Sequence, residues 1–173
     1  MKKTSLEHYT DYIFEGDEKT NTKTRIAVRG FFKKDNLYLV NKVKRNDIFG
    51  NITYYESPGG GKKVNETLLE TLKREFLEET GYEVINPVLI DITVDSYNLI
   101  KQNNITFFFT GEIKEKEKID HKESYGDSLI IAQPLLSLDE LIKEYQKMNT
   151  DVAALIKQRE LPVLIKLKER SDL

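Results

Sequence analysis

Three glutamates near the middle of the chain, Glu75, Glu78 and Glu79, are spaced to lie on one face of a helix. At about 100° per residue, with Leu68 at zero, they fall near 340°, 280° and 20°. Carboxylates at i, i+3 and i+4 repel one another by about 0.2–0.5 kcal/mol per pair. A hard divalent cation such as Mg²⁺, or Mn²⁺ in its place, prefers clustered carboxylate oxygens. The spacing therefore predicts a metal site on this helix.

The alternative interpretation is a solvated, charged helix face, and we accept it for Glu70 and Lys73. It does not account for Glu79, whose angle lies within the apolar arc of the same helix. The three acids also stand toward the helix C-terminus, where the helix dipole disfavours anions by about 0.3–1 kcal/mol. Arg74 alone cannot neutralise all three charges.

A helix over about 66–80 must carry these side chains, and its ends have sequence signals. Asn65 is a predicted N-cap, and Gly81 stands where a left-handed residue ends a helix. The helix also has an apolar stripe that we expect to be buried. That stripe comprises Leu68, Leu69, Leu72 and Phe76.

The remaining pattern predicts an α/β (α+β) fold, with a mixed β-sheet sandwiched between helices. The polar, basic stretch 42–51 is interpreted as a loop. Pro162 is predicted to begin a final segment after Leu161. The other predicted strands lie at 25–32, 37–40, 52–56, 88–94, 105–113 and 128–136, and the other predicted helices at 139–148 and 151–168.

Composition limits the function classes. The 173 residues suit one domain, which we place at 25–173, after an extension (1–24) that could add an edge strand. The absence of cysteine excludes thiol nucleophiles and thiolate metal sites, and it fits the cytoplasm. A net charge of −2 argues against a nucleic-acid partner, and no apolar run suggests a membrane partner.

The stretch Gly60 to Tyr82 reads GGKKVNETLLETLKREFLEETGY. It matches the Nudix box, G-x5-E-x7-R-E-U-x-E-E-x-G-U, at every fixed position, so the sequence resembles the Nudix hydrolase superfamily. The resemblance implies hydrolysis of a nucleoside diphosphate linked to another moiety. That moiety makes the substrate a nucleoside triphosphate, a modified deoxynucleotide, or a nucleotide sugar such as ADP-ribose.

The resemblance also implies roles for box residues. Glu78 and Glu79 become metal ligands, and Glu75 becomes a ligand or a base that orients water. Arg74 holds a box carboxylate by a charge-assisted hydrogen bond. Gly60 lets the backbone approach closely and offers its carbonyl to the metal. Glu66 is expected to brace the loop and helix start.

A further acid often comes from a loop beyond the later strand. Glu123 is the first candidate for this catalytic and metal-binding acid, Glu112 the second and Asp127 the third. For the substrate, Arg29, Lys42, Lys44 and Tyr55 are the candidate contacts, because basic side chains bind phosphate and aromatic rings stack on bases.

The leading hypothesis is therefore a Mg²⁺-dependent pyrophosphohydrolase with a small nucleotide substrate, acting by attack of water on phosphorus. The alternative is a non-catalytic Nudix-fold module that binds nucleotides as a sensor. Such modules usually lack box acids, and all are present here. The sequence is also compatible with a homodimer.

Overall fold

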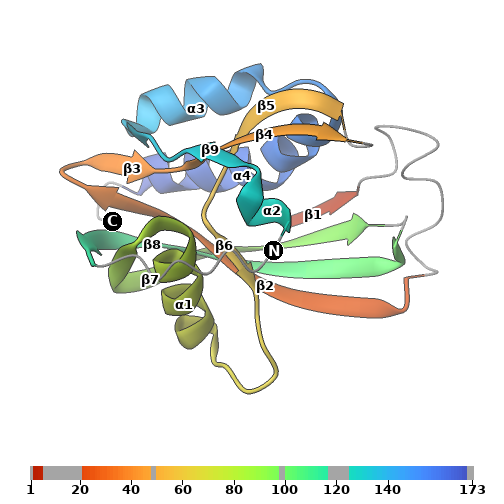
Figure 1. The fold of residues 1–173 in the computed structure, drawn as a ribbon, viewed down its shortest axis with the longest axis horizontal. Coiled ribbons are helices and arrows are strands. Elements are labelled where there is room, and N and C mark those ends of the chain that lie inside the picture. Colours follow the sequence, from red (N-terminus) through yellow and green to blue (C-terminus); the bar gives the residue numbers. More distant parts are fainter. Residues whose placement is uncertain (1, 6–20, 48–49, 98–99, 117–124, 171–173) are drawn as a thin grey trace.

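A mixed β-sheet forms the centre of the molecule, which the computed structural model describes for residues 2–5, 21–47, 50–97, 100–116 and 125–170 (Figure 1). The strand order is β1-β7-β8-β2-β3-β10, and β6 also pairs with β2. The β1–β7 and β2–β8 pairs are parallel, whereas the other pairs are antiparallel. The strands are β1 (Lys2–Ser5), β2 (Lys23–Lys34), β3 (Leu37–Leu39), β6 (Gly59–Gly61), β7 (Tyr82–Tyr97), β8 (Gln102–Glu115) and β10 (Leu135–Leu136).

A smaller sheet stands beside the large one, with the order β5-β4-β9. It consists of β4 (Asn41–Asp47), β5 (Gly50–Glu56) and β9 (Ile130–Ala132). The predicted loop at 42–51 is therefore wrong, because most of it is the β4–β5 pair. The predicted strand at 128–136 is also divided, since β9 pairs with β4 and β10 pairs with β3.

Helices cover the large sheet on both sides (Figure 1). Successive side chains of β2 point to opposite faces, so Phe31 joins one buried cluster while Val28 and Phe32 join another. The predicted mixed sheet between helices is confirmed. The helices are α1 (Leu68–Thr80), α2 (Tyr125–Ser128), α3 (Leu138–Lys147) and α4 (Asp151–Glu169).

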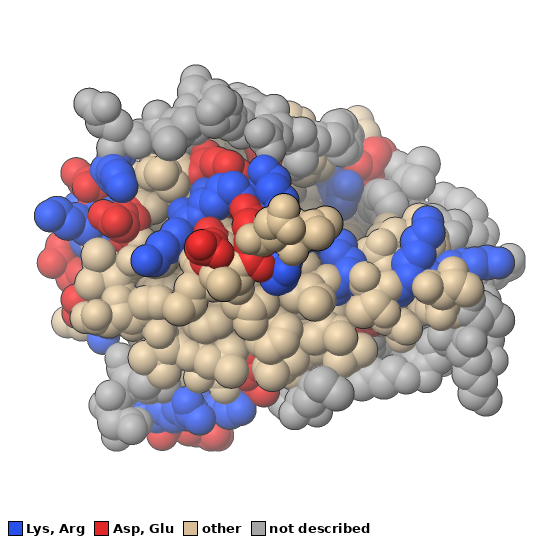
Figure 2. Space-filling view, turned by 90° about the horizontal axis from the view of Figure 1, so that it is seen from below, with Lys and Arg blue, Asp and Glu red and all other residues tan. Residues whose placement is uncertain are grey.

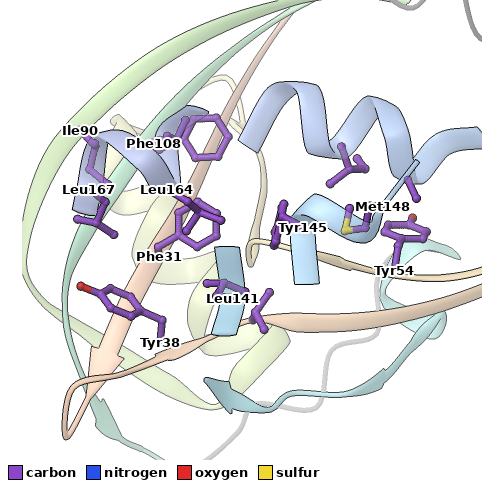
Figure 3. Close-up of a cluster of buried hydrophobic side chains, with 14 of the residues drawn as sticks. Phe31, Tyr38, Tyr54, Ile90, Phe108, Leu141, Tyr145, Met148, Leu164 and Leu167 are labelled. Carbon is purple, nitrogen blue, oxygen red and sulfur yellow. The ribbon is translucent and has the colours of Figure 1, made fainter. Parts of the chain in front are cut away.

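The larger cluster lies between the sheets and the C-terminal helices (Figure 3). Phe31 stacks on Phe108 and meets Tyr145 edge-on, each at 6.2 Å between ring centroids. Leu164 of α4 and Leu141 of α3 are completely buried in it. This packing fixes α4 against the sheet, and α4 forms one wall of a cavity described below.

Helix α1 packs against the opposite face, and its ends are well capped. Thr67, rather than the predicted Asn65, is the N-cap: its hydroxyl accepts from the Glu70 N–H, and the Glu70 carboxylate accepts from the Thr67 N–H. Gly81 ends the helix in the left-handed conformation, as predicted, with φ of 74°. The Leu69 prediction is wrong, because this side chain is 45% exposed.

Helix α4 continues through Pro162, which does not start a new segment. A proline inside a helix removes one hydrogen bond, yet Val163 and Leu164 directly after it are fully buried and hold the helix in place. Among the described residues, no helix combines the length and the apolar character needed to cross a membrane.

Candidate functional site

The three-residue strand β6 lies directly beside α1, the helix that carries Glu75, Glu78 and Glu79. Gly60 pairs with Val28 of β2, while the carboxyl group of Glu75 lies over its Cα. A Cβ at Gly60 would stand 2.5 Å from Cδ and Oε2 of Glu75. Only glycine leaves room for this contact, so Gly60 allows the Glu75 carboxylate to lie against the β6 backbone.

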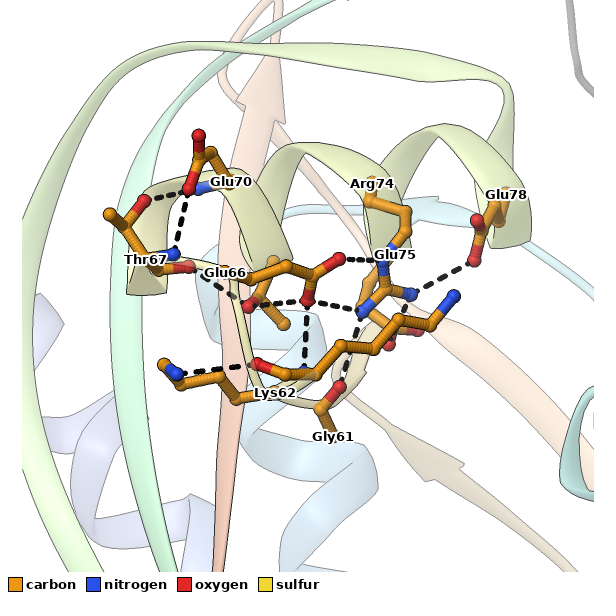
Figure 4. Close-up of polar contacts among 10 residues, drawn as sticks. Gly61, Lys62, Glu66, Thr67, Glu70, Arg74, Glu75 and Glu78 are labelled. Carbon is orange, nitrogen blue, oxygen red and sulfur yellow. Dashed lines mark hydrogen bonds and ion pairs between the residues drawn. The ribbon is translucent and has the colours of Figure 1, made fainter.

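Arg74 is the centre of an ion-pair cluster on α1 (Figure 4). Its Nε donates to Oε1 of Glu66 at 2.5 Å and its Nη2 to Oε2 at 2.8 Å. Its Nη1 donates to Glu75 at 2.7 Å and to Glu78 at 3.1 Å, and Nη2 also reaches the Gly61 carbonyl at 3.2 Å. Arg74 thus makes the predicted charge-assisted hydrogen bonds to box carboxylates.

Glu66 braces the loop before α1, as the sequence suggested. Its carboxylate accepts from the backbone N–H of Lys63 at 3.0 Å and from the Thr71 hydroxyl at 2.9 Å. The Arg74 hydrogen bond and these further donors lower the pKa of Glu66 to about 2. Glu66 therefore stays ionised and fixes Arg74.

Glu79 is held by a separate set of partners, away from Arg74. Its Oε2 accepts from Asn41 Nδ2 at 2.9 Å and from the Gly59 N–H at 3.1 Å. Gln133 completes the arrangement by donating to Asn41 Oδ1 and to the Glu79 backbone carbonyl, both at 2.9 Å. Burial raises the pKa of the Glu79 carboxyl to about 8, although Arg29 and Asn41 oppose the shift.

Arg74, Glu75, Glu78 and Glu79 line an acidic pocket of about 280 Å³. Burial raises the pKa of Glu75 above its ordinary value; Arg74 opposes the shift, and the charges of Glu78 and Asp127 add to it. The lining residues are Arg25, Arg29, Glu56, Gly59, Gly60, Gly61, Lys63, Arg74, Glu75, Glu78, Glu79, Gly126, Asp127 and Ile130.

The donors in the acidic pocket are chemically suited to a hard divalent cation, because carboxylates and backbone carbonyls supply oxygen ligands. Within the described residues, no three His, Cys, Asp or Glu side chains converge into a preformed metal cluster. Instead, Glu75 and Glu78 share the Arg74 guanidinium. The oxygen ligands therefore fit a divalent cation. In this structure the positive charge beside Glu75 and Glu78 is the Arg74 guanidinium.

A larger pocket of about 460 Å³ adjoins the acidic pocket, and the two share Arg25, Arg29, Glu56 and Gly126 in their linings. Cross-strand neighbours on one face of the large sheet form its floor: Asp95, Asn104 and Arg25 make one row, and Tyr97 and Gln102 the next. Its walls come from the small sheet and α4: Val43, Arg45, Tyr54, Glu56, Val152, Leu155, Ile156 and Arg159.

The two pocket linings carry charges of both signs, including Arg25 and Arg29 beside Glu56. On the face shown in Figure 2, Lys and Arg side chains lie directly beside Asp and Glu side chains. The net charge of −2 therefore averages neighbouring charges of opposite sign.

The sequence profile described as NUDIX domain matches residues 9–158. The chain belongs to the Nudix family. The prediction of a Nudix hydrolase enzyme is thereby confirmed. A relative from Buchnera aphidicola subsp. Schizaphis graminum, named 8-oxo-dGTP diphosphatase, is 29% identical over 129 residues, which cover 72% of this chain and 95% of the relative.

Solved structures of other proteins share the fold. The ORF135 protein of E. coli superposes with a TM-score of 0.62 at 14% identity, covering 87% of this chain and 93% of that one. The MutT protein of Methanosarcina mazei Go1 gives a TM-score of 0.60 at 19% identity, covering 88% and 98%. At these identities the likeness supports the fold alone.

The structure brings most of the predicted Nudix box residues to one pocket. Gly60, Arg74, Glu75, Glu78 and Glu79 line it, together with Arg29 from β2.

The three candidates for the acid outside the Nudix box lie in different places. Glu123 falls in 117–124, outside the described residues. Asp127, the third candidate, lines the acidic pocket. Glu112 lies instead in a separate surface depression beside the β2–β3 turn, with Lys33 and Lys34.

The other predicted substrate contacts lie outside both pocket linings. Lys42 and Tyr55 are paired across β4 and β5, with the Lys42 ammonium 5.7 Å from the centre of the Tyr55 ring. Lys44 is exposed on the same strand. Alternation along β4 directs Val43 and Arg45 to the larger pocket.

Several site residues were missed. Arg25 and Arg29, four apart on one strand, share a face, and this spacing could have identified Arg25. Asn41, Gln133 and Arg159 carry no local signal, because their partners lie far away in the sequence.

Proposed function

We propose that this protein hydrolyses a pyrophosphate bond in a nucleoside diphosphate linked to another moiety, with Mg²⁺ or Mn²⁺ as cofactor. The observation that carries the proposal is the continuity of the two pockets. The acidic pocket holds the box carboxylates, the larger pocket has room for an organic group, and Arg25 and Arg29 stand in both linings.

Glu78, Glu79 and Glu75, with the Gly60 carbonyl, are the proposed metal ligands. A bound divalent ion would neutralise pyrophosphate charge and lower the pKa of water. Arg74 keeps Glu75 and Glu78 oriented through its hydrogen bonds to both. Glu66 keeps Arg74 itself in place.

The attacking water needs a group that accepts its proton and a fixed position in line with phosphorus. Glu75 is one candidate, because its carboxylate lines the acidic pocket beside Glu78 and Glu79. Glu123 stays our candidate acid from outside the box. Asp127 competes with it, since it lines the acidic pocket.

The larger pocket is the proposed site of the nucleoside. Its volume of about 460 Å³ lies within the roughly 300–1,000 Å³ typical of small-ligand sites. Tyr54 and Tyr97 offer aromatic surface, and Gln102 and Asn104 offer amide donors and acceptors. Arg25 and Arg29, at the junction, would meet the phosphates.

Nucleoside triphosphates, modified deoxynucleotides and nucleotide sugars such as ADP-ribose are all candidate substrates. The 29%-identical relative named 8-oxo-dGTP diphosphatase makes that nucleotide the first to test. The panel should include the unmodified triphosphates, ADP-ribose, nucleotide sugars and dinucleoside polyphosphates. Release of phosphate, pyrophosphate or a nucleoside monophosphate is measured with Mg²⁺, with Mn²⁺ and with chelator.

We expect metal-dependent turnover of at least one nucleotide and its loss in Glu78→Gln. Lys73→Ala is the matched control, because Lys73 is an exposed neighbour on the same helix. Nucleotide binding without turnover across the panel would contradict the proposal and favour the sensor module.

A further inference from the structure

Glu160 of α4 is a completely buried carboxylate that stands 103 residues from its backbone partner Ser57. Burying a charge is costly unless it is paired and hydrogen-bonded. Glu160 lies outside the Nudix box and does not line either pocket. Its position therefore calls for an explanation from its contacts.

Both carboxylate oxygens are fully engaged. Oε2 accepts from the Ser57 N–H at 2.8 Å and from the Tyr145 hydroxyl at 2.7 Å. Oε1 accepts from Arg159 Nη2 at 2.5 Å. One carboxylate thus joins the core, through Tyr145, to a backbone segment and to a pocket arginine.

The segment Ser57–Gly59 leads from β5 into β6, and its backbone groups have partners on every side. The Ser57 carbonyl accepts from Arg29 at 2.5 Å, and the Pro58 carbonyl accepts from the Gly30 N–H at 3.1 Å. The Gly59 N–H donates to Glu79 at 3.1 Å. Glu160 therefore holds the first N–H of this segment and Glu79 holds the last.

Arg159 connects Glu160 to the larger pocket. Besides its bond to Glu160, it lies 3.9 Å from Asp95 and 3.9 Å from Glu56. Its Nε is buried without a hydrogen-bond partner among the described residues. The bond to Glu160, at 2.5 Å, is shorter than either of these ion pairs, so the carboxylate sets the direction of the guanidinium in the pocket wall.

We propose that Glu160 is a positioning residue of the candidate site. It fixes the Ser57–Gly59 segment so that the Gly59 N–H meets Glu79 and Gly60, next along the chain, stays in the lining of the acidic pocket, and it orients Arg159. This inference rests on the proposed function. A purely structural role would instead stabilise α4 without affecting Glu79 or metal binding.

Glu160→Gln separates the two roles. Glutamine has nearly the same shape but replaces one acceptor oxygen by a donor, which must face either Arg159 or the Ser57 and Tyr145 donors. Tyr145→Phe is the matched control. It removes one bond from the same carboxylate while leaving the Ser57 and Arg159 bonds.

Three quantities are compared in the variants: the melting temperature, amide hydrogen exchange at Ser57 and Gly59 without metal, and the Mg²⁺ dissociation constant from calorimetry. Both variants should melt at lower temperature. Only Glu160→Gln should speed exchange at Gly59 and weaken Mg²⁺ binding, by the roughly 10–100-fold typical of lost outer-shell support. If Glu160→Gln does not fold, Glu160→Asp is measured in the same way, because the shorter side chain keeps the charge but withdraws it from Ser57.

Unchanged Gly59 exchange and Mg²⁺ affinity in a folded Glu160 variant would overturn the proposal, as would equal shifts in Tyr145→Phe. Turnover is measured separately on the nucleotide panel. Failure of the wild-type protein to turn over any nucleotide would contradict the proposed hydrolase, whereas the exchange and calorimetry data still decide the role of Glu160.

Discussion

Arg74 and Glu66 form a two-point ion pair, in which Nε meets Oε1 at 2.5 Å and Nη2 meets Oε2 at 2.8 Å. Glu66 precedes helix α1 and Arg74 lies within it, so the pair fastens the loop to the helix. The parallel geometry uses two of the three guanidinium nitrogens. The third, Nη1, serves Glu75 and Glu78.

Arg74→Lys should therefore lower both stability and activity. Lysine keeps the charge but cannot bridge both oxygens of Glu66 while also holding two further carboxylates. We expect a loss of about 1.5–3 kcal/mol in the free energy of unfolding, as for a hydrogen bond to a charged group. Urea denaturation and kcat/KM measure the two effects. Lys73→Ala should change neither, and an equal effect in both variants would contradict this role.

Gly60→Ala should reduce activity without unfolding the protein. The new methyl group would collide with the carboxyl group of Glu75 at 2.5 Å and push it from its place. Loss of about 10-fold or more in kcat is expected, in the range for displaced supporting groups. Lys73→Ala is the control, because Lys73 is exposed on the same helix as Glu75 and lies outside both pocket linings. Similar kcat values for the two variants would show that the Glu75 position is unimportant.

Glu79→Gln should abolish turnover and remove a pH dependence of stability. With a folded-state pKa of about 8 against an ordinary value of 4.5, the folded protein keeps a proton that the unfolded chain loses. The metal-free wild type should therefore lose stability as the pH rises from 4.5 to 8, and the variant should not. Denaturation at pH 5 and pH 9 in chelator measures this, and parallel pH profiles would contradict it.

Arg25→Ala should raise KM by about tenfold, which corresponds to a loss of roughly 1.4 kcal/mol of interaction with the phosphates. Arg25 lines both pockets. Lys44→Ala should leave KM unchanged, because Lys44 is exposed and outside both linings. Steady-state kinetics on the preferred nucleotide test the pair. A larger effect at Lys44 would mean that the substrate binds on the other face of β4.

The box helix was predictable because its signals are local. The apolar spacing of Leu72 and Phe76, the glycine at its end and the carboxylate angles all belong to one segment. The correct N-cap, Thr67, could also have been predicted from local sequence. Thr67 followed by Glu70 is a capping-box pair, a stronger signal than Asn65 alone.

Strand β5 was largely predicted, at 52–56, but its partner β4 was missed because β4 has few apolar residues to reveal alternation. Val43 is buried, but the next inward position carries Arg45, which is satisfied by Asp47 at 3.0 Å. A charged residue at an inward position hides a strand from a hydrophobicity pattern.

Partners from distant segments were also beyond local reasoning. Asn41, Gln133 and Glu160 act through side chains that meet only after the sheets have formed.

The parallel pairing of β2 with β8 has a consequence for the route to the native state. Phe31 and Thr110 stand opposite each other although 79 residues separate them. Closing so long a loop costs chain entropy before any contact compensates it, and such distant pairings slow folding. Helix α1, which carries Glu75, Glu78 and Glu79, lies inside this loop. It therefore has no complete sheet to pack against until β8 has been synthesised. The candidate site is therefore expected to assemble late, after most of the chain is available.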